Sequence, residues 1–279
     1  MTLDDFAQRP WLALDDSDLG GARGAPSMLN PEEARFYVWL SRTMAGVDGA
    51  VVDLGCFAGG STAYLAEGTR QGGGQAQIHA FDQFAASEKV KERQLYSKGV
   101  APFDGTDILP LAQQVLAPWA PNVHFHKGRI EDSVWEDGPI ALLVLDASKT
   151  SETMDQMAAI FFPHLIPGQS IIVQQDELHW KEPWIAVQME AFADHFEPLC
   201  HVPGGTVAYR CIKAIDQAAL ANGAVDGMSD QDMIAALSLA AERLSFLNVA
   251  DKLARQQEAI RLNPGKRKSW SFKNRAPRM

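Results

Sequence analysis

The sequence predicts a doubly wound α/β fold: a mostly parallel sheet of seven strands that ends in an antiparallel hairpin and is followed by a helical extension. Three observations lead to this prediction. From about residue 30 onward, short apolar segments alternate with helical ones, a pattern that favours parallel strands joined by right-handed crossovers. One apolar segment runs straight into a glycine-rich turn and then a helix. The last two strand segments are separated only by Pro203-Gly204-Gly205, which suits a hairpin and is too short for a crossover.

The elements are expected in the following order. Residues 1–29 are rich in Gly, Asp and Pro and predict an irregular arm. Asn30 and Pro31 are typical of a helix cap and first helical position, so a helix begins there. The predicted strands are the apolar runs 51–54, 78–81, 123–126, 140–145, 170–173, 196–202 and 206–213.

Three further segments complete the predicted organisation. Residues 85–120 form a polar, partly helical insertion that could act as a lid over a bound ligand. A helix is expected over residues 151–165. Residues 214–279 return to helical patterns and end in a basic tail, which predicts an appendage for packing or for homodimer formation.

Composition excludes several classes of protein. A net charge of −10 argues against nucleic acid as the main partner, because a nucleic-acid binder needs a basic face. No apolar run approaches the length needed to span a membrane, and the acidic N-terminus lacks a signal pattern, so we expect a cytoplasmic protein. The three cysteines are widely spaced, which argues against a zinc site or a disulfide framework.

The most informative stretch is residues 51–62, V-V-D-L-G-C-F-A-G-G-S-T. A strand that ends in an acid and three glycines and re-enters as a helix brings bare backbone N–H groups to one point. A dinucleotide-binding turn would need glycine where Phe57 stands, and the Gly-Lys-Ser/Thr of a phosphate loop is missing. The turn therefore predicts a nucleoside-bearing ligand without a pyrophosphate.

Two other strand ends fit such a ligand. Asp82 ends the second strand 22 residues after Gly60, the place of an acid that accepts hydrogen bonds from ribose hydroxyls. Gly128-Arg129-Ile130 follows the third strand and could flank an adenine, or form an ordinary turn.

From about residue 30 to residue 213 the chain resembles the class I S-adenosylmethionine-dependent methyltransferases, which share a Rossmann-like fold. The resemblance rests on the stretch 51–62, on H-A-F-D-Q-F, L-V-L-D and L-I-P-G-Q, and on the final hairpin. The first motif is most similar to small-molecule O-methyltransferases, including macrocin-type sugar methyltransferases and their cephalosporin-hydroxylase-like relatives. The resemblance implies S-adenosylmethionine as cofactor and a small molecule as methyl acceptor. The cofactor-binding residues that it implies are Asp53, Gly55, Cys56, Phe57, Gly59, Gly60, Ser61, Thr62, Asp82, Gln83, Gly128, Arg129 and Ile130.

The sequence departs from the pattern of these methyltransferases at the positions where many of them bind magnesium. Those relatives use an acid on the fourth strand, which Asp146 matches, and further acids at positions occupied here by Ser148 and by Gln174-Gln175. Asp176 is displaced by one or two residues. Because hard divalent cations prefer carboxylate oxygens, the sequence predicts a reaction without a catalytic metal.

Without a metal, transfer to a hydroxyl needs a general base. His179 lies just past the fifth strand and is the preferred candidate, with Asp146 and Asp176 next. The alternative for His179 is a structural role, stacked on a neighbouring tryptophan.

Three residues could contact the acceptor. Lys149 could bind an anionic acceptor. Trp180 and Trp184 offer flat apolar surface, although tryptophans equally often fill a core. Two alternative functions stay open: methyl transfer to nitrogen, which needs no strong base, and a regulatory protein that binds S-adenosylmethionine without turnover.

Overall fold

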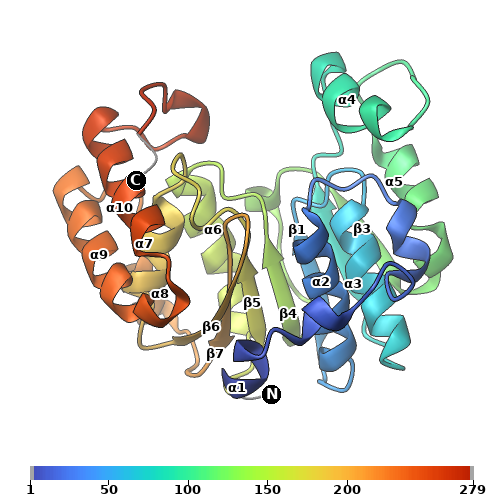
Figure 1. Ribbon diagram of the computed structural model, residues 1–279, viewed down its shortest axis with the longest axis horizontal. Helices are drawn as coiled ribbons and strands as arrows, with labels where there is room; N and C mark the ends of the chain where they lie inside the picture. The colour runs from blue at the N-terminus through green and yellow to red at the C-terminus, as the bar shows by residue number, and fades with distance from the viewer. Residues whose placement is uncertain (1–2, 277–279) are drawn as a thin grey trace. The chain divides into compact units, whose positions relative to one another are not determined.

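The computed structural model describes residues 3–276 and shows a seven-stranded sheet in the order β3-β2-β1-β4-β5-β7-β6 (Figure 1). β1, β2 and β3 pair in parallel, and β7 runs antiparallel to both β5 and β6. The predicted fold class is thereby confirmed. The strands are β1 (Ala50–Leu54), β2 (Ile78–Asp82), β3 (Val123–Lys127), β4 (Ile140–Leu145), β5 (Ile171–Gln174), β6 (Phe196–Val202) and β7 (Thr206–Cys211).

The chain divides into two compact units, Met1–Leu143 and Val144–Met279, which we call the N-terminal and the C-terminal unit. The sequence instead predicted boundaries after residues 29 and 213, between an arm, a methyltransferase domain and a helical extension. Those boundaries stay a prediction. Each unit is described by itself below.

The N-terminal unit contains β1 to β3, most of β4, and the helices of the first 143 residues. α2 begins where the sequence predicts, because Asn30 Oδ1 accepts hydrogen bonds from the N–H groups of Glu32 and Glu33 at 2.9 and 3.0 Å. Its helices are α1 (Leu3–Ala7), η1 (Pro10–Ala13), η2 (Gly20–Gly24), α2 (Pro31–Met44), α3 (Gly60–Gln71), α4 (Glu88–Gln94), η3 (Tyr96–Lys98), α5 (Leu109–Val115), η4 (Ala117–Asn122) and η5 (Ile130–Asp132).

The N-terminal arm is more ordered than its composition predicts. Trp11 is fully buried and packs against Phe36 and Trp39 of α2 at centroid distances of 5.0 and 5.4 Å. Its indole N–H donates a hydrogen bond to Glu32 Oε1 at 3.0 Å. Aromatic burial thus fixes a segment whose Gly and Asp content favours irregular structure.

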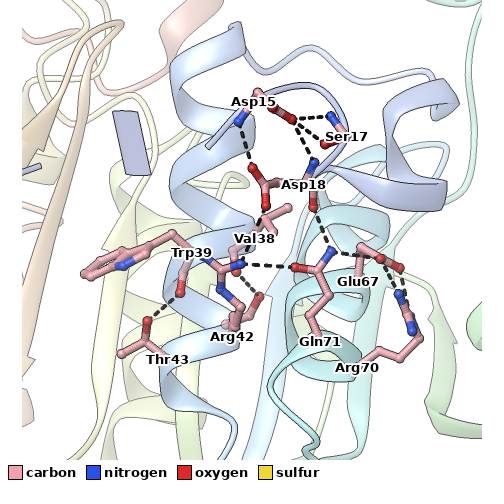
Figure 2. Close-up of polar contacts among 11 residues, drawn as sticks. Asp15, Ser17, Asp18, Val38, Trp39, Arg42, Thr43, Glu67, Arg70 and Gln71 are labelled. Atoms are coloured by element: carbon pink, nitrogen blue, oxygen red, sulfur yellow. Dashed lines mark hydrogen bonds and ion pairs between the residues drawn. The ribbon is translucent and has the colours of Figure 1, made fainter. Parts of the chain in front are cut away.

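A polar network ties the same arm to α2 and α3 (Figure 2). The side chain of Gln71 donates to the backbone oxygen of Asp18 at 2.7 Å and to Glu67 Oε1 at 2.9 Å. Arg42 of α2 lies 3.5 Å from Gln71 Oε1 and 4.0 Å from Asp18 Oδ1. One glutamine side chain therefore links three segments that lie far apart in the sequence.

The insertion at residues 85–120 has a small core of its own. The ammonium group of Lys91 is buried and donates hydrogen bonds to the backbone oxygens of Phe103 and Gly105 at 2.7 and 2.9 Å. Farther along, the indole of Trp119 donates to Glu67 Oε2 of α3 at 3.1 Å. The end of the insertion is therefore part of the body of the unit, and a lid function can concern only the segment around α4, which projects beyond the strands in Figure 1.

The C-terminal unit contains the end of β4, the strands β5 to β7, and the helical extension. The predicted helix over residues 151–165 is an α-helix that continues as a 3₁₀ turn, and the last strand ends two residues earlier than expected. The helices of this unit are α6 (Ser151–Phe161), η6 (Phe162–His164), α7 (Trp184–Ala191), α8 (Gln217–Gly223), α9 (Asp230–Arg243), η7 (Ser245–Leu247), α10 (Ala250–Leu262) and η8 (Ser269–Ser271).

The helical extension packs within its own unit. Arg243 at the end of α9 forms an ion pair with Glu190 at 2.8 Å and donates to the backbone oxygen of Met189 at 2.7 Å. In the basic tail, Arg267 pairs with Asp230 at 2.7 Å. Arg255 of α10 donates to the backbone oxygen of Ala276 at 3.3 Å, and the last arginine of the tail, Arg278, lies outside the described residues.

Candidate functional site

The turn after β1 is held in an unusual backbone conformation. Phe57 has φ 51° and Gly59 has φ 84°. Both angles lie in the left-handed region, which residues other than glycine rarely adopt. The N–H of Phe57 donates a hydrogen bond to Asp82 Oδ2 at 3.0 Å, which stabilises this conformation. The N–H groups of Gly55 and Cys56 both donate to the backbone oxygen of Phe81, at 2.8 and 3.2 Å. The turn is therefore pinned to β2 by backbone and side-chain contacts.

A buried carboxylate lies under this turn. Asp53 is fully buried, and its Oδ2 accepts hydrogen bonds from the hydroxyls of Ser61 and Thr62 at 2.7 and 2.6 Å. Burial raises the pKa of Asp53 to about 6, against the effect of both hydroxyls. Within residues 3–276 the Oδ1 atom finds no hydrogen-bond partner, so the turn retains acceptor capacity for a donor group of a ligand.

Asp82 has a structural role that the sequence did not reveal. Besides the N–H of Phe57, it accepts a hydrogen bond from the N–H of Phe84 at 2.7 Å. Burial raises the pKa of Asp82, although these backbone N–H groups oppose the shift. Because each carboxylate oxygen has further lone pairs, the predicted contact to ribose hydroxyls is compatible with this arrangement.

The glycines of the turn are needed for packing inside the protein. A Cβ atom on Gly60 would lie 2.5 Å from the backbone oxygen of Pro26 and 2.7 Å from Ser27 Cα, and one on Gly59 would lie 2.8 Å from Leu116 Cδ1. The sequence interpretation assigned these glycines to the approach of a ligand. The structure adds close contact with the N-terminal arm and with the end of α5.

The end of β3 joins the same group of residues. The N–H of Gly128 donates to the backbone oxygen of Asp82 at 3.0 Å, and the Ile130 side chain is buried. Arg129 extends into solvent and pairs with Glu131 at 2.6 Å, and Gln83 is also exposed. The predicted cofactor residues of the N-terminal unit thus gather at the carboxyl ends of β1, β2 and β3.

A second cluster of predicted residues lies in the C-terminal unit, around the ammonium group of Lys149. Its Nζ atom lies 2.9 Å from Asp176 Oδ2, 3.2 Å from Asp146 Oδ1 and 3.6 Å from Glu182 Oε2. Asp146 follows β4, and Asp176 follows β5 with φ 61°. Glu182 was missed by sequence reasoning, although an acid between Trp180 and Trp184 just before α7 was a usable signal.

The charges in this cluster are coupled. Burial opposes the charged form of Lys149, but Asp146, Glu182 and Asp176 together raise the pKa of its ammonium above the ordinary value. Burial raises the pKa of Glu182 to about 8, with Lys149 opposing the shift. The positive charge of Lys149 is therefore balanced inside the protein by neighbouring acids, and its contact with an anionic acceptor stays a prediction.

His179 is half-buried in the loop after β5. Its backbone N–H donates to the backbone oxygen of Asp176 at 2.8 Å, and burial lowers the pKa of its imidazole, with Asp176 opposing the shift. Among the described residues its buried Nδ1 atom has no hydrogen-bond partner. An imidazole that is neutral at pH 7 and has an unpaired nitrogen can accept a proton.

Gln256 of α10 supports this loop, and nothing in the sequence pointed to it. Its fully buried side-chain amide donates to the backbone oxygens of Glu177 and His179, at 2.6 and 3.1 Å. The helical extension therefore fixes the loop that carries the candidate base.

The prediction that Trp184 offers a surface to the acceptor is wrong. This side chain is fully buried, its indole donates to the backbone oxygen of Ser148 at 2.7 Å, and its ring packs against Phe272. Trp180 is 9% exposed and also contacts Phe272. Its ring centroid lies 6.3 Å from that of His179. Both tryptophans fill space beneath the loop, the alternative that the sequence left open.

The residues present do not fit the magnesium ion that many relatives bind. Gln174 and Gln175 are buried, where Gln174 donates to the sulfur of Met189 and Gln175 accepts from the hydroxyl of Thr206. Residues 3–276 contain no group of three or more His, Cys, Asp or Glu side chains that could hold a metal ion. At the remaining carboxylates the position of a cation is taken by the Lys149 ammonium.

A cavity of about 600 Å³ lies near the start of β2 and β3, at the opposite end of these strands from Asp82. His79, His124 and His126 line it, and His79 Nδ1 lies 2.9 Å from His126 Nε2. The sequence assigned His124 and His126 a structural role, which their contacts with His79 support.

Comparisons with known proteins agree with this geometry. Residues 52–175 match a family described as a methyltransferase domain. The O-methyltransferase NovP is 13% identical and covers 76% of this chain and 98% of its own, with a TM-score of 0.54, which supports the fold. Two other structures superpose less closely. The S-adenosylhomocysteine-bound methyltransferase PaMTH1 of Podospora anserina is 15% identical and covers 76% of this chain and 88% of its own, with a TM-score of 0.45. The calicheamicin methyltransferase CalS11 is 19% identical and covers 64% of this chain and 78% of its own, with a TM-score of 0.46.

The search of curated proteins found no match. None of the helices in residues 3–276 is long and apolar enough to cross a membrane.

Proposed function

We propose that this chain is a class I S-adenosylmethionine-dependent methyltransferase and that it methylates a hydroxyl group of a small molecule without a catalytic metal. The observation that carries the proposal is the half-buried His179, whose lowered pKa and unpaired Nδ1 suit a general base. The sulfonium of the cofactor supplies the electrophilic methyl group. The protein has to orient the acceptor and remove its proton.

The N-terminal unit would hold the methyl donor. The unpaired Oδ1 of Asp53 and the pinned turn offer polar contacts to its methionine part, and Asp82 offers its lone pairs to the ribose. The residues proposed for the cofactor remain Asp53, Gly55, Cys56, Phe57, Gly59, Gly60, Ser61, Thr62, Asp82, Gln83, Gly128, Arg129 and Ile130.

The C-terminal unit would supply the groups that act on the acceptor. His179 takes the hydroxyl proton, while Asp146 and Asp176 already accept hydrogen bonds from Lys149 and are weaker candidates for a base. A neutral imidazole suits proton transfer near pH 7 better than an acid that is engaged with an ammonium group.

Calorimetry and turnover assays test the proposal together. We expect the purified protein to bind both S-adenosylmethionine and S-adenosylhomocysteine. It should methylate members of a panel of hydroxylated small molecules equally well in EDTA and in magnesium. Transfer only to amines would favour N-methylation, and binding without turnover would favour a regulatory protein. Strict dependence on magnesium would contradict the metal-free mechanism.

Homodimer formation through the C-terminal helices is a further proposal. Leu239 of α9 is 56% exposed and Phe246 of η7 is 55% exposed, although both are large and apolar. Light scattering should show a dimer that is weakened by Leu239→Glu. A cytoplasmic location and a lid function of the segment around α4 likewise remain proposals.

A further inference from the structure

We propose that the ammonium group of Lys149 is the built-in cation of the acceptor site, in the place where many relatives bind a divalent metal. The inference rests on the proposed function only where it names the methyl acceptor as the molecule that Lys149 contacts. The arrangement of the charges can be tested without turnover.

The geometry supports an ammonium better than a magnesium ion. The three carboxylate oxygens lie 2.9, 3.2 and 3.6 Å from Lys149 Nζ. Two of these distances are those of N–H···O hydrogen bonds, whereas magnesium needs oxygens at about 2.1 Å. The oxygens are therefore spaced around a nitrogen.

Glu182 supplies an independent indication that the cluster is built around a cation. Its side chain is 5% exposed, and no hydrogen bond from the described residues reaches Oε2, which points at Lys149 from 3.6 Å. A buried carboxylate oxygen without a hydrogen bond is costly unless a positive charge lies near it. Lys149 is the cation that the structure places there.

The ammonium group of Lys149 can donate one further hydrogen bond to the methyl acceptor. Two of its three N–H bonds serve Asp146 and Asp176, and 42% of its side chain is exposed. The third N–H can donate to an acceptor oxygen and stabilise the negative charge that develops as His179 removes the proton. The expected acceptors are therefore molecules with an acidic hydroxyl, such as a phenol or an enol.

The test is binding of Mn²⁺, followed by electron paramagnetic resonance, to the full-length protein and to Lys149→Ala. As they stand, Asp146, Asp176 and Glu182 do not form a metal site, and their oxygens lie 2.9–3.6 Å from Lys149 Nζ. Removal of the ammonium should let these three side chains close on one Mn²⁺ per chain. We expect binding to Lys149→Ala at least tenfold tighter than to the wild type, and loss of this gain in Lys149→Ala/Glu182→Gln. Mn²⁺ should also raise the Tm of Lys149→Ala and leave that of the wild type unchanged.

Lys181→Ala is the matched control, because Lys181 lies in the same loop and its ammonium is placed over the ring of Trp180, 5.3 Å from the centroid. This variant should bind Mn²⁺ no better than the wild type. If Lys149→Ala does not fold, Lys149→Met retains most of the side-chain stem and serves in its place.

One result would overturn the inference: Mn²⁺ binding to the folded Lys149→Ala or Lys149→Met variant no tighter than to the wild type. Calorimetry of S-adenosylmethionine on the same wild-type sample separates the two proposals. Failure of cofactor binding would contradict the proposed function and leave the Mn²⁺ comparison intact.

Discussion

Among the individual residues, His179 has the clearest chemical consequence. His179→Ala removes the candidate base and should lower kcat by about 10²- to 10⁴-fold, the usual contribution of a positioned base. The affinity for S-adenosylmethionine should be unchanged. The measurement is initial rate with saturating cofactor, with cofactor affinity from calorimetry.

The pH profile adds a readout specific to the imidazole. Because burial lowers the pKa of His179, kcat/KM of the wild type should fall on the acid side through a pKa below 6.5. His195→Ala removes another partly exposed histidine of the same unit and should keep the wild-type rate. A wild-type rate in His179→Ala would contradict the role of His179 as the general base.

At the scale of elements, α10 controls the loop that follows β5. Gln256→Ala leaves the backbone oxygens of Glu177 and His179 without their buried donor. The expected loss of stability is about 1–3 kcal/mol, and kcat should fall while cofactor affinity is retained. Urea unfolding and initial rates provide the measurements.

The neighbouring Gln257 provides the matched control. Its side chain is partly exposed and donates to Ile234 O and Ser238 Oγ, away from the loop. Gln257→Ala should change the stability by less than about 1 kcal/mol and leave kcat unchanged. Equal effects of the two substitutions would contradict a specific role of Gln256.

The contact between the N-terminal arm and the turn can be tested in the same way. Gly60→Ala places a Cβ atom 2.5 Å from the backbone oxygen of Pro26 and should cost about 1–3 kcal/mol of stability, because backbone atoms cannot easily move aside. Gly46→Ala, where a Cβ meets nothing within 4 Å, should have little effect. Thermal unfolding of both variants decides whether the close contact exists.

The sequence predicted the elements well because their signals are local. Asn30 with Pro31 gave the start of α2, and the apolar run of β4 gave its exact bounds. The sequence predicted an irregular N-terminal arm but not its attachment, because Trp11 packs against residues of α2, a contact that local composition does not reveal.

For the candidate site, the sequence indicated which residues lie at strand ends. It could not show that Asp82 holds the N–H groups of Phe57 and Phe84, or that Gln256 reaches the loop from a position 77 residues away from His179. Such contacts depend on tertiary packing. Trp184 was offered as binding surface because burial cannot be read from a single aromatic residue.

For the molecule as a whole, buried acids make the folding equilibrium depend on pH. Glu177 is fully buried, accepts a hydrogen bond from the hydroxyl of Tyr209 at 2.5 Å, and has its pKa raised by burial from 4.5 to about 8. The folded state then holds a proton that the unfolded state has lost. The contribution of Glu177 to the stability of the fold is complete below pH 4.5 and is lost as the pH rises through 8.

Between pH 5.5 and pH 8.5 this group alone should reduce the free energy of unfolding by about 3 kcal/mol. Glu177→Gln keeps an acceptor for Tyr209 but cannot ionise, so its urea-unfolding free energy should fall less over this range. Identical pH dependence of the two proteins would show that Glu177 titrates normally.

The hydrogen bonds from Gln256 also bear on how this enzyme can diverge and be engineered. A helix outside residues 52–175, the stretch shared with the family, supports the loop that carries His179. Substrate range and C-terminal sequence are therefore expected to change together during evolution. Chimeric enzymes should keep β5 and α10 from the same parent, because a junction after residue 213 would separate the loop from its support.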